Sequence, residues 1–171
     1  MINEEIVKIA SVDFSAGTMI VGRGCADTIP QGHKAGAIAW CYLLGAGINE
    51  IKYTAGEQLK VKLLTHTAQQ TLDASKAPEL TITTRQRQAR PYPPGKVQIN
   101  GIYGNKITDS SAFKLPWAHR DRDVQADKLI PHTDGSTSQD KAVSYKVDLM
   151  DGNTLVRSIT TTGTEFVYPD A

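Results

Sequence analysis

The chain has 171 residues, and its 19 Lys and Arg residues nearly balance its 18 Asp and Glu residues. A net charge this close to zero creates no field that would attract nucleic acid or an anionic membrane. No apolar run approaches the roughly 18 residues of a membrane-spanning helix, and the N-terminus lacks the basic start of a secretory signal. We therefore expect a soluble protein made in a cytoplasm, with no nucleic-acid partner and no membrane insertion.

The first third of the chain predicts a hairpin, a loop and a buried strand. The segments EEIVKIASV and TMIVGRG flank a turn cluster around Gly17, which is typical of a β-hairpin. Residues 23–36 are rich in Gly, Pro, Asp and Thr without a sustained period and predict a long ordered loop. The following run, AIAWCYLL, is continuously apolar and predicts a strand buried on both faces, although a short helix also fits.

Two alternating segments follow. In EQLKVKLLTHT, Leu59, Val61 and Leu63 alternate with lysines, which predicts a strand with one apolar face. In ELTITTRQR, Leu80 and Ile82 alternate with threonines in the same way, and we expect both to point inward.

A proline-rich joint, ARPYPPG, predicts the boundary between two domains, residues 1–90 and 91–171. Three prolines within four positions hold the backbone extended and limit its freedom. The domains should therefore keep a restricted relative orientation, with an aromatic ring at the junction. The linker comprises Arg90, Pro91, Tyr92, Pro93 and Pro94.

Beyond the joint, the sequence again predicts strands. GKVQING indicates a short strand, and the polar residues 121–139 indicate a connection. AVSYKVDLMDGNTLVRSITTT is the strongest hairpin signal, because alternating residues flank the turn dipeptide Asp151-Gly152. TEFVYP, after Gly163, predicts a third strand.

No set of side chains predicts a catalytic, cofactor or metal site. The four histidines, His33, His66, His119 and His132, share no metal-binding spacing. Three nearby carboxylates, Asp121, Asp123 and Asp127, alternate with basic residues, so a self-paired loop is favoured over a calcium site. We expect both cysteines to be free thiols, with Cys41 buried in its apolar run.

The two tryptophans are interpreted as core residues. Trp117 shares one face of an expected strand with Leu115, and Trp40 lies in the apolar run. The basic segment RQRQAR has little aromatic complement, so a joint or interface role is favoured over nucleic-acid binding.

Four motifs, taken in order, resemble bacteriophage tail proteins. EEIVKI, followed by Gly-Arg-Gly at positions 22–24 and then a Thr, a His and a Gly, resembles a pattern common in those proteins. ARPYPPGKVQING resembles the linker and first strand that come next. LPWAHRDR and YKVDLMDGNTLVRS resemble the second strand and next hairpin of a fibronectin type III-like domain. The motif residues are Arg23, Thr28, His33, Gly36 and Trp117.

The resemblance implies an all-β chain: a small N-terminal β domain followed by a fibronectin type III-like β-sandwich. It implies a structural, non-enzymatic component of a phage or prophage tail tip, hub or baseplate, or of a gene transfer agent. Such a component supports tail assembly and presents a surface for host recognition. Its partners would be other tail or baseplate proteins, it would form a homo-oligomer, a trimer by resemblance, and it would reside in the virion.

Two departures from the family pattern generate expectations. Pro116 lacks a ladder donor, so its strand is expected at an edge or bulged. The sequence stops where a sandwich of about seven strands still lacks two, so we expect an excerpt of a longer protein or an open sandwich with an unpaired edge.

Two other functions stay open from the sequence. A glycan-binding or cell-surface-binding module would need Trp117 or Tyr103 exposed. A cell-wall hydrolase fragment would need a paired acid and nucleophile, which the sequence does not provide. For the loop at 23–36, we expect Arg23, Thr28 and His33 to bond loop backbone groups and hold the loop closed.

Overall fold

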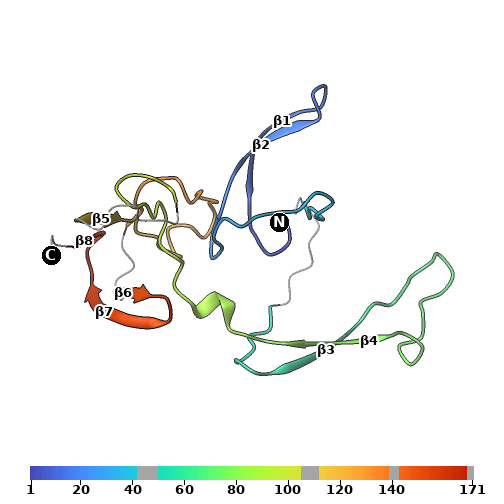
Figure 1. The fold of residues 1–171 in the computed structure, drawn as a ribbon. Coiled ribbons are helices and arrows are strands. Elements are labelled where there is room, and N and C mark those ends of the chain that lie inside the picture. The colour runs from blue at the N-terminus through green and yellow to red at the C-terminus, as the bar shows by residue number, and fades with distance from the viewer. Residues whose placement is uncertain (42–49, 105–111, 139–142, 169–171) are drawn as a thin grey trace. The chain divides into compact units, whose positions relative to one another are not determined.

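The computed structural model describes residues 1–41, 50–104, 112–138 and 143–168. Within these ranges the chain is built from antiparallel strands and a single short 3-10 helix (Figure 1), which confirms the predicted all-β fold. In chain order the elements are β1 (Lys8–Asp13), β2 (Thr18–Gly22), β3 (Gln58–Lys62), β4 (Glu79–Thr83), η1 (Arg87–Ala89), β5 (Phe113–Pro116), β6 (Tyr145–Asp151), β7 (Thr154–Thr161) and β8 (Glu165–Tyr168).

The chain forms two compact units. One unit combines Met1–Leu43 with Pro91–Ala171, and the other is Leu44–Arg90. Within the first unit, the His132 backbone N–H donates to the Arg23 carbonyl at 2.8 Å, which ties the N-terminal loop to the C-terminal half. The proline joint starts where the second unit ends; the division into domains 1–90 and 91–171 stays a prediction.

The predicted N-terminal hairpin is confirmed. Strands β1 and β2 pair with Val12 opposite Met19 and Ile9 opposite Val21, so these apolar residues share one face. Gly17 takes the positive φ, +64°, that the turn requires.

The second unit contains the two alternating segments as the hairpin β3–β4. Leu59 lies opposite Ile82 and Val61 opposite Leu80, so the predicted apolar face is confirmed. However, the side chains of Leu80 and Ile82 are 56% and 50% exposed, and the expectation that both point inward is wrong. Within the described part of this unit, no second layer covers the apolar face of the two-stranded sheet.

In its described part, the apolar run after residue 36 does not form the expected buried strand. Over residues 37–41, its backbone makes an isolated bridge between Ala39 and Ile2, while Ile38 and Trp40 are 64% and 58% exposed. Cys41 is also exposed, so the predictions of burial for Trp40 and Cys41 are wrong. A single bridge does not make a strand, and the exposed side chains show that no described layer covers this segment. The rest of the run, residues 42–44, lies outside the described residues.

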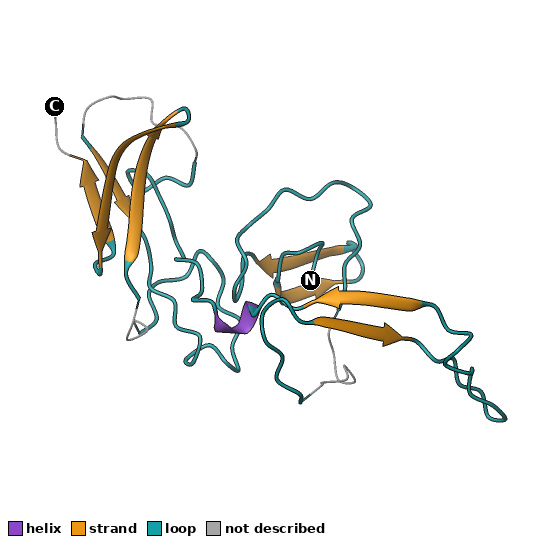
Figure 2. Ribbon diagram, turned by 90° about the horizontal axis from the view of Figure 1, so that it is seen from below, coloured by secondary structure: helices purple, strands orange, loops and turns teal. Residues whose placement is uncertain are grey.

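The C-terminal half builds two sheets, β5–β8 and β6–β7 (Figure 2, the strands nearest the C-terminus). The strongest predicted hairpin is confirmed as β6–β7, with Gly152 at φ +56° in its turn. The predicted third strand is confirmed as β8, which pairs with β5. Residues 95–100 bond to the other side of β5, for example from the Asn100 N–H to the Lys114 carbonyl at 2.9 Å.

Pro116 does not place its strand at an edge. Since β5 has backbone partners on both sides and keeps a regular register with β8, the expected edge or bulge is wrong. Pro116 is the last residue of β5, where its carbonyl still accepts the Gln98 N–H at 3.1 Å. The missing N–H therefore removes only one bond at the end of the ladder.

The core of this half lies between the two sheets. Phe113, Trp117 and Phe166 are buried, and the Trp117 ring packs edge-on against Tyr145 of β6 at 5.3 Å between centroids. Leu115 packs against the same cluster, which confirms the predicted pairing of Leu115 and Trp117. The remaining residues packed around it are Ile99, Val147, Leu149, Ile159 and Tyr168. The two small sheets thus share one aromatic core, and the fibronectin type III-like β-sandwich stays a prediction.

We expect Phe166→Ala to lower the free energy of unfolding by about 3–5 kcal/mol, because it removes a buried ring and leaves a cavity. Urea denaturation followed by circular dichroism measures the loss. Val167→Ala is the matched control, since Val167 is the next residue of β8 and is 45% exposed. Equal losses for the two variants would contradict this assignment of the core.

Candidate functional site at the buried Glu5 carboxylate

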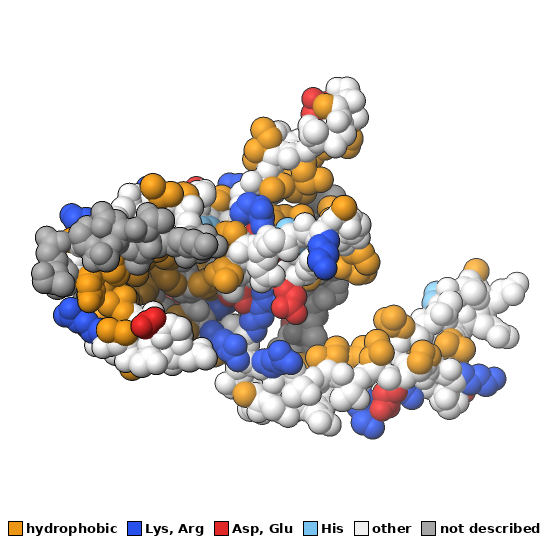
Figure 3. All heavy atoms as spheres, in the orientation of Figure 1, with side chains coloured by type: hydrophobic (Ala, Val, Ile, Leu, Met, Phe, Trp, Pro, Cys, Tyr) orange, Lys and Arg blue, Asp and Glu red, His pale blue; other side chains and the backbone are white. Residues whose placement is uncertain are grey.

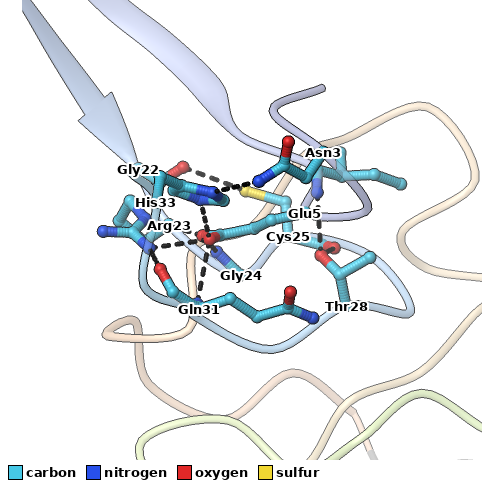
Figure 4. Close-up of polar contacts among 10 residues, drawn as sticks. Asn3, Glu5, Gly22, Arg23, Gly24, Cys25, Thr28, Gln31 and His33 are labelled. Atoms are coloured by element: carbon cyan, nitrogen blue, oxygen red, sulfur yellow. Dashed lines mark hydrogen bonds and ion pairs between the residues drawn. The ribbon is translucent and has the colours of Figure 1, made fainter. Parts of the chain in front are cut away.

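Glu5 has no solvent-exposed side-chain surface, although it stands next to the exposed Glu4. It is held just before β1 by a tight turn, in which Ile2 and Glu5 exchange backbone hydrogen bonds at 2.8 and 2.9 Å. The turn directs the carboxylate into the loop that follows β2 (Figure 4). A buried carboxylate is costly unless donors surround it.

Donors from the loop surround both carboxylate oxygens. Arg23 donates through Nε to Oε1 and through Nη2 to Oε2, each at 2.7 Å, a two-point pairing that suits guanidinium and carboxylate geometry. The Gly24 N–H donates to Oε1 at 2.8 Å, and the Gln31 N–H donates to Oε2 at 3.0 Å. His33 Nε2 lies 2.7 Å from Oε2. Five donor contacts from one loop therefore converge on Glu5.

The rest of the loop is closed by its own backbone and by Thr28. The Thr28 hydroxyl accepts the Ile6 N–H at 3.0 Å and donates to the Cys25 carbonyl at 2.7 Å. Arg23 Nη2 also donates to the Gln31 carbonyl. Gly24 has φ +56°, and a side chain there would collide with Pro30. Only a glycine at this position lets the loop fold back over Glu5.

His33 completes the site from the exposed side. Its Nε2 faces Glu5, and its Nδ1 lies 3.2 Å from Nδ2 of Asn3. Both contacts are satisfied together when Nε2 carries the proton and Nδ1 accepts from the Asn3 amide. The histidine therefore acts here as a hydrogen-bonding link between the loop and the N-terminal turn.

The environment keeps Glu5 ionised. Burial by itself raises the pKa of Glu5, but the hydrogen bonds to its oxygens outweigh burial and lower the pKa from 4.5 to about 2. Because donors take up both oxygens, the carboxylate is suited to holding the loop and poorly suited to moving a proton.

A second buried charge, Arg120, has the opposite sign and an analogous role. Its Nη1 donates to the carbonyls of His119 and Gly135, each at 2.9 Å. Its Nη2 donates to the carbonyls of Pro131 and Asp134, each at 3.0 Å. Burial lowers the pKa of Arg120 from its ordinary value. The guanidinium thus binds carbonyl groups of residues 131–135 and of the neighbouring His119, as Glu5 binds donors of the loop at 23–36.

The two centres are joined through His132. Its N–H donates to the Arg23 carbonyl at 2.8 Å, and its carbonyl accepts the Lys96 N–H at 2.6 Å. Gly22 also lies directly against Pro131, leaving no room for a side chain. The loop around Glu5 and the loop around Arg120 therefore form one continuous polar structure at the base of β1–β2.

The structure brings together three of the five predicted motif residues. Arg23, Thr28 and His33 lie in the Glu5 loop, while Gly36 has φ +84° in open space and Trp117 lies in the core. In the linker, the centroid of the Tyr92 ring lies 4.3 Å from the guanidinium carbon of Arg122. The relation of Tyr92 to the two domains stays a prediction.

The other candidates form no shared site. Among the described residues, no group of three or more His, Cys, Asp and Glu side chains is placed to hold a metal ion. Asp121 accepts the Asp123 N–H at 2.9 Å and the Ser138 hydroxyl at 3.0 Å. The self-paired loop, in which these carboxylates pair with the neighbouring basic residues, stays a prediction. Cys25 is a buried free thiol whose pKa is raised by burial, and Cys41 is free and exposed.

Comparison with known proteins gives no relative: no family model matches the chain, and no curated protein matches it. In the part of the chain that the structure describes, no helix has the length and apolar character to cross a membrane.

Glu5 and Arg120 were missed as site residues by sequence reasoning. A glutamate beside another glutamate looks like a surface residue, and Arg120 stands in the charged segment HRDR. The available signal was indirect: the loop at 23–36 contains Arg23, His33 and several free backbone donors, which need an anionic acceptor if the loop is to be ordered.

We expect Glu5→Gln to destabilise the protein by about 3 kcal/mol at neutral pH, because the amide cannot accept all the donors of the loop. Glu4→Gln is the matched control and should be close to neutral, since Glu4 is exposed. Chemical denaturation measures both. A Glu5→Gln variant as stable as the control would contradict the assigned role.

The stability contributed by Glu5 should depend on pH. The folded pKa of about 2 lies below the ordinary 4.5, so the contribution is complete above about pH 4.5 and is lost as pH falls towards 2. A shift of this size corresponds to about 3 kcal/mol. Denaturation between pH 6 and 2 should give a shallower profile for Glu5→Gln than for the wild type, and parallel profiles would contradict the linkage.

We also expect Gly95→Ala to destabilise the protein by about 1–3 kcal/mol, because an added methyl group would overlap the Arg120 guanidinium. Gly104→Ala is the control, since nothing lies within 4 Å of a methyl group there. Thermal denaturation compares the two variants. An unchanged Gly95→Ala midpoint would mean that Arg120 moves freely and does not organise its loop.

Proposed function

We propose that the chain is a structural subunit of the tail tip or baseplate of a phage or prophage particle, where it supports assembly and presents a surface for host recognition. Its partners are other tail or baseplate proteins, and it forms a homo-oligomer in the tail, a trimer by resemblance. It is made in the bacterial cytoplasm and resides in the virion. The ordered set of sequence motifs supports the phage assignment, and the geometry of β1–β2 supports the assembly role.

The observation that carries the assembly role is the apolar face of β1–β2. Ile9, Val12 and Met19 are 47%, 43% and 53% exposed on this face, and Phe14 at the turn is 92% exposed. Figure 3 shows apolar side chains along this hairpin. Contiguous apolar surface of this kind marks interaction sites, and a lone two-stranded hairpin is marginally stable in water. A neighbouring subunit would cover the face.

The hairpin is rooted in the Glu5 centre. Arg23 and Gly24, immediately after β2, bind the Glu5 carboxylate, and Glu5 lies just before β1. The two strands therefore extend from a base that the Glu5 contacts hold in place. Ordering the base in advance lowers the entropic cost of docking the hairpin on a partner.

The second unit supports the same role independently. β3–β4 also has one apolar face, with Leu80 and Ile82 about half exposed. Its opposite face carries the ion pair between Lys60 and Glu79, at 2.9 Å. One charged face and one apolar face suit a ribbon that packs against another protein.

We propose a non-catalytic role because Glu5 is the acid whose pKa is shifted most among the described residues, and loop donors occupy its carboxylate oxygens. The glycan-binding alternative loses one of its two candidate platforms, since Trp117 is buried. Tyr103, the other, is 48% exposed.

The test is incorporation into particles. Prophage induction in the bacterium that encodes the chain, followed by particle purification and quantitative mass spectrometry, should find the chain in the tail fraction. Met19→Ser should lower incorporation about tenfold, as expected for an apolar contact at an interface. Ile20→Ser is the matched control, because Ile20 is the next residue, is 68% exposed and lies on the opposite face. Purified particles that lack the wild-type chain would overturn the proposal.

A further inference from the structure

Strand β6 pairs with β7 along one of its two edges. In the sheet formed by the described strands, β6 pairs with β7 and with no other strand. Over residues 146–151, its second edge therefore presents backbone donors and acceptors to whatever lies next to it. Such an edge is a template for adding a strand.

The two faces of β6 differ in a way that specifies the added strand. Val147 and Leu149 are half-buried and pack against the aromatic core, whereas Lys146 and Asp148 point outward. Their outward side chains form an ion pair at 2.9 Å. An added strand that extends the sheet must supply apolar residues on the inner face and alternating charges on the outer face.

Strand β6 itself meets this requirement. In an antiparallel pair related by a two-fold axis, Val147 can lie opposite Val147 of the second copy. Lys146 then lies opposite Asp148 of the second copy, and Asp148 lies opposite its Lys146. Opposite charges meet twice on the outer face, and valines meet on the inner face.

The alternatives are less favourable. Shifting the axis to Asp148 would place two aspartates opposite each other, which is destabilising. Strands β7 and β8 each carry a single charged residue, Arg157 and Glu165, so neither can make complementary charge pairs with its own copy. β5 already has backbone partners on both sides.

We propose that two copies of this chain associate through their β6 edges, with Val147 on the two-fold axis, to form a continuous sheet in the order β7, β6, β6, β7. The inference rests on the geometry and charges of β6 and does not depend on the proposed role in a phage tail.

The first measurement is the mass of the purified full chain by analytical ultracentrifugation. Pairing along one short strand buries little surface and is weak, so the concentration series extends to about 1 mM. We expect a monomer–dimer equilibrium. A clean monomer throughout the series overturns the proposal.

The second measurement uses charge reversal to test the register. Lys146→Asp alone places Asp opposite Asp twice, and Asp148→Lys alone places Lys opposite Lys twice, so each variant should dimerise at least about tenfold more weakly than the wild type. An equimolar mixture should recover a heterodimer with an affinity within about threefold of the wild type. In the mixture, the aspartate introduced in one variant faces the lysine introduced in the other.

Lys114→Asp and Glu165→Lys are the controls. They change the net charge by the same amounts at exposed residues of the other sheet, β5–β8, and should dimerise like the wild type. If they weaken and recover in the same way, net charge is responsible and the proposal is overturned. Undiminished dimers of the β6 variants would place the interface elsewhere, for example on the apolar hairpin faces, and would also overturn it.

Circular dichroism checks the fold of every variant. If a single variant misfolds, the double variant Lys146→Asp with Asp148→Lys takes its place, since it keeps both charges in reversed order. The double variant should dimerise like the wild type, and loss of its dimer overturns the register. These outcomes are separate from those of the particle experiment, which tests the β1–β2 face.

Discussion

The ion pair between the buried Glu5 and the partly exposed Arg23 is the interaction on which the N-terminal part of the structure depends. A carboxylate without solvent contact is tolerated only when its charge and lone pairs are satisfied, and here a single loop supplies every donor. The loop contains no regular secondary structure of its own, so its order comes from the acceptor that it encloses. The dependence is mutual, because the buried carboxylate would be costly without the donors of the loop, and the loop would lose the acceptor that orders it.

Arg120 extends this principle to the C-terminal half. Its guanidinium binds loop carbonyls, which are the groups that Glu5 cannot satisfy, and the two loops meet through His132. Large buried apolar side chains are few among the described residues, with Phe113, Trp117 and Phe166 as the central cluster. Two polar centres of opposite sign therefore organise segments that the small aromatic core does not reach.

Sequence patterns predicted the hairpins because alternation with a period of two is a local property. It is visible in the pairs Leu59 with Val61 and Val147 with Leu149, which do share faces. Burial is not local. Ile38 and Trp40 lie in an apolar run, yet they are exposed because no layer of the described chain covers them. Glu5 shows the converse: its burial depends on a loop that begins 18 positions later, at Arg23.

The exposure of the apolar residues follows from this arrangement, in which polar centres, and not a covering apolar layer, fix the loops. Polar centres fix the loops at the base of β1–β2, so the base of this hairpin is held while its apolar face stays uncovered by the described chain. Because any partner that binds the folded state stabilises it by mass action, a chain of this design would gain stability from a bound partner. Marginal hairpins such as β1–β2 and β3–β4 would gain the most, since they bury least alone. Folding and binding would then be coupled most strongly at those strands.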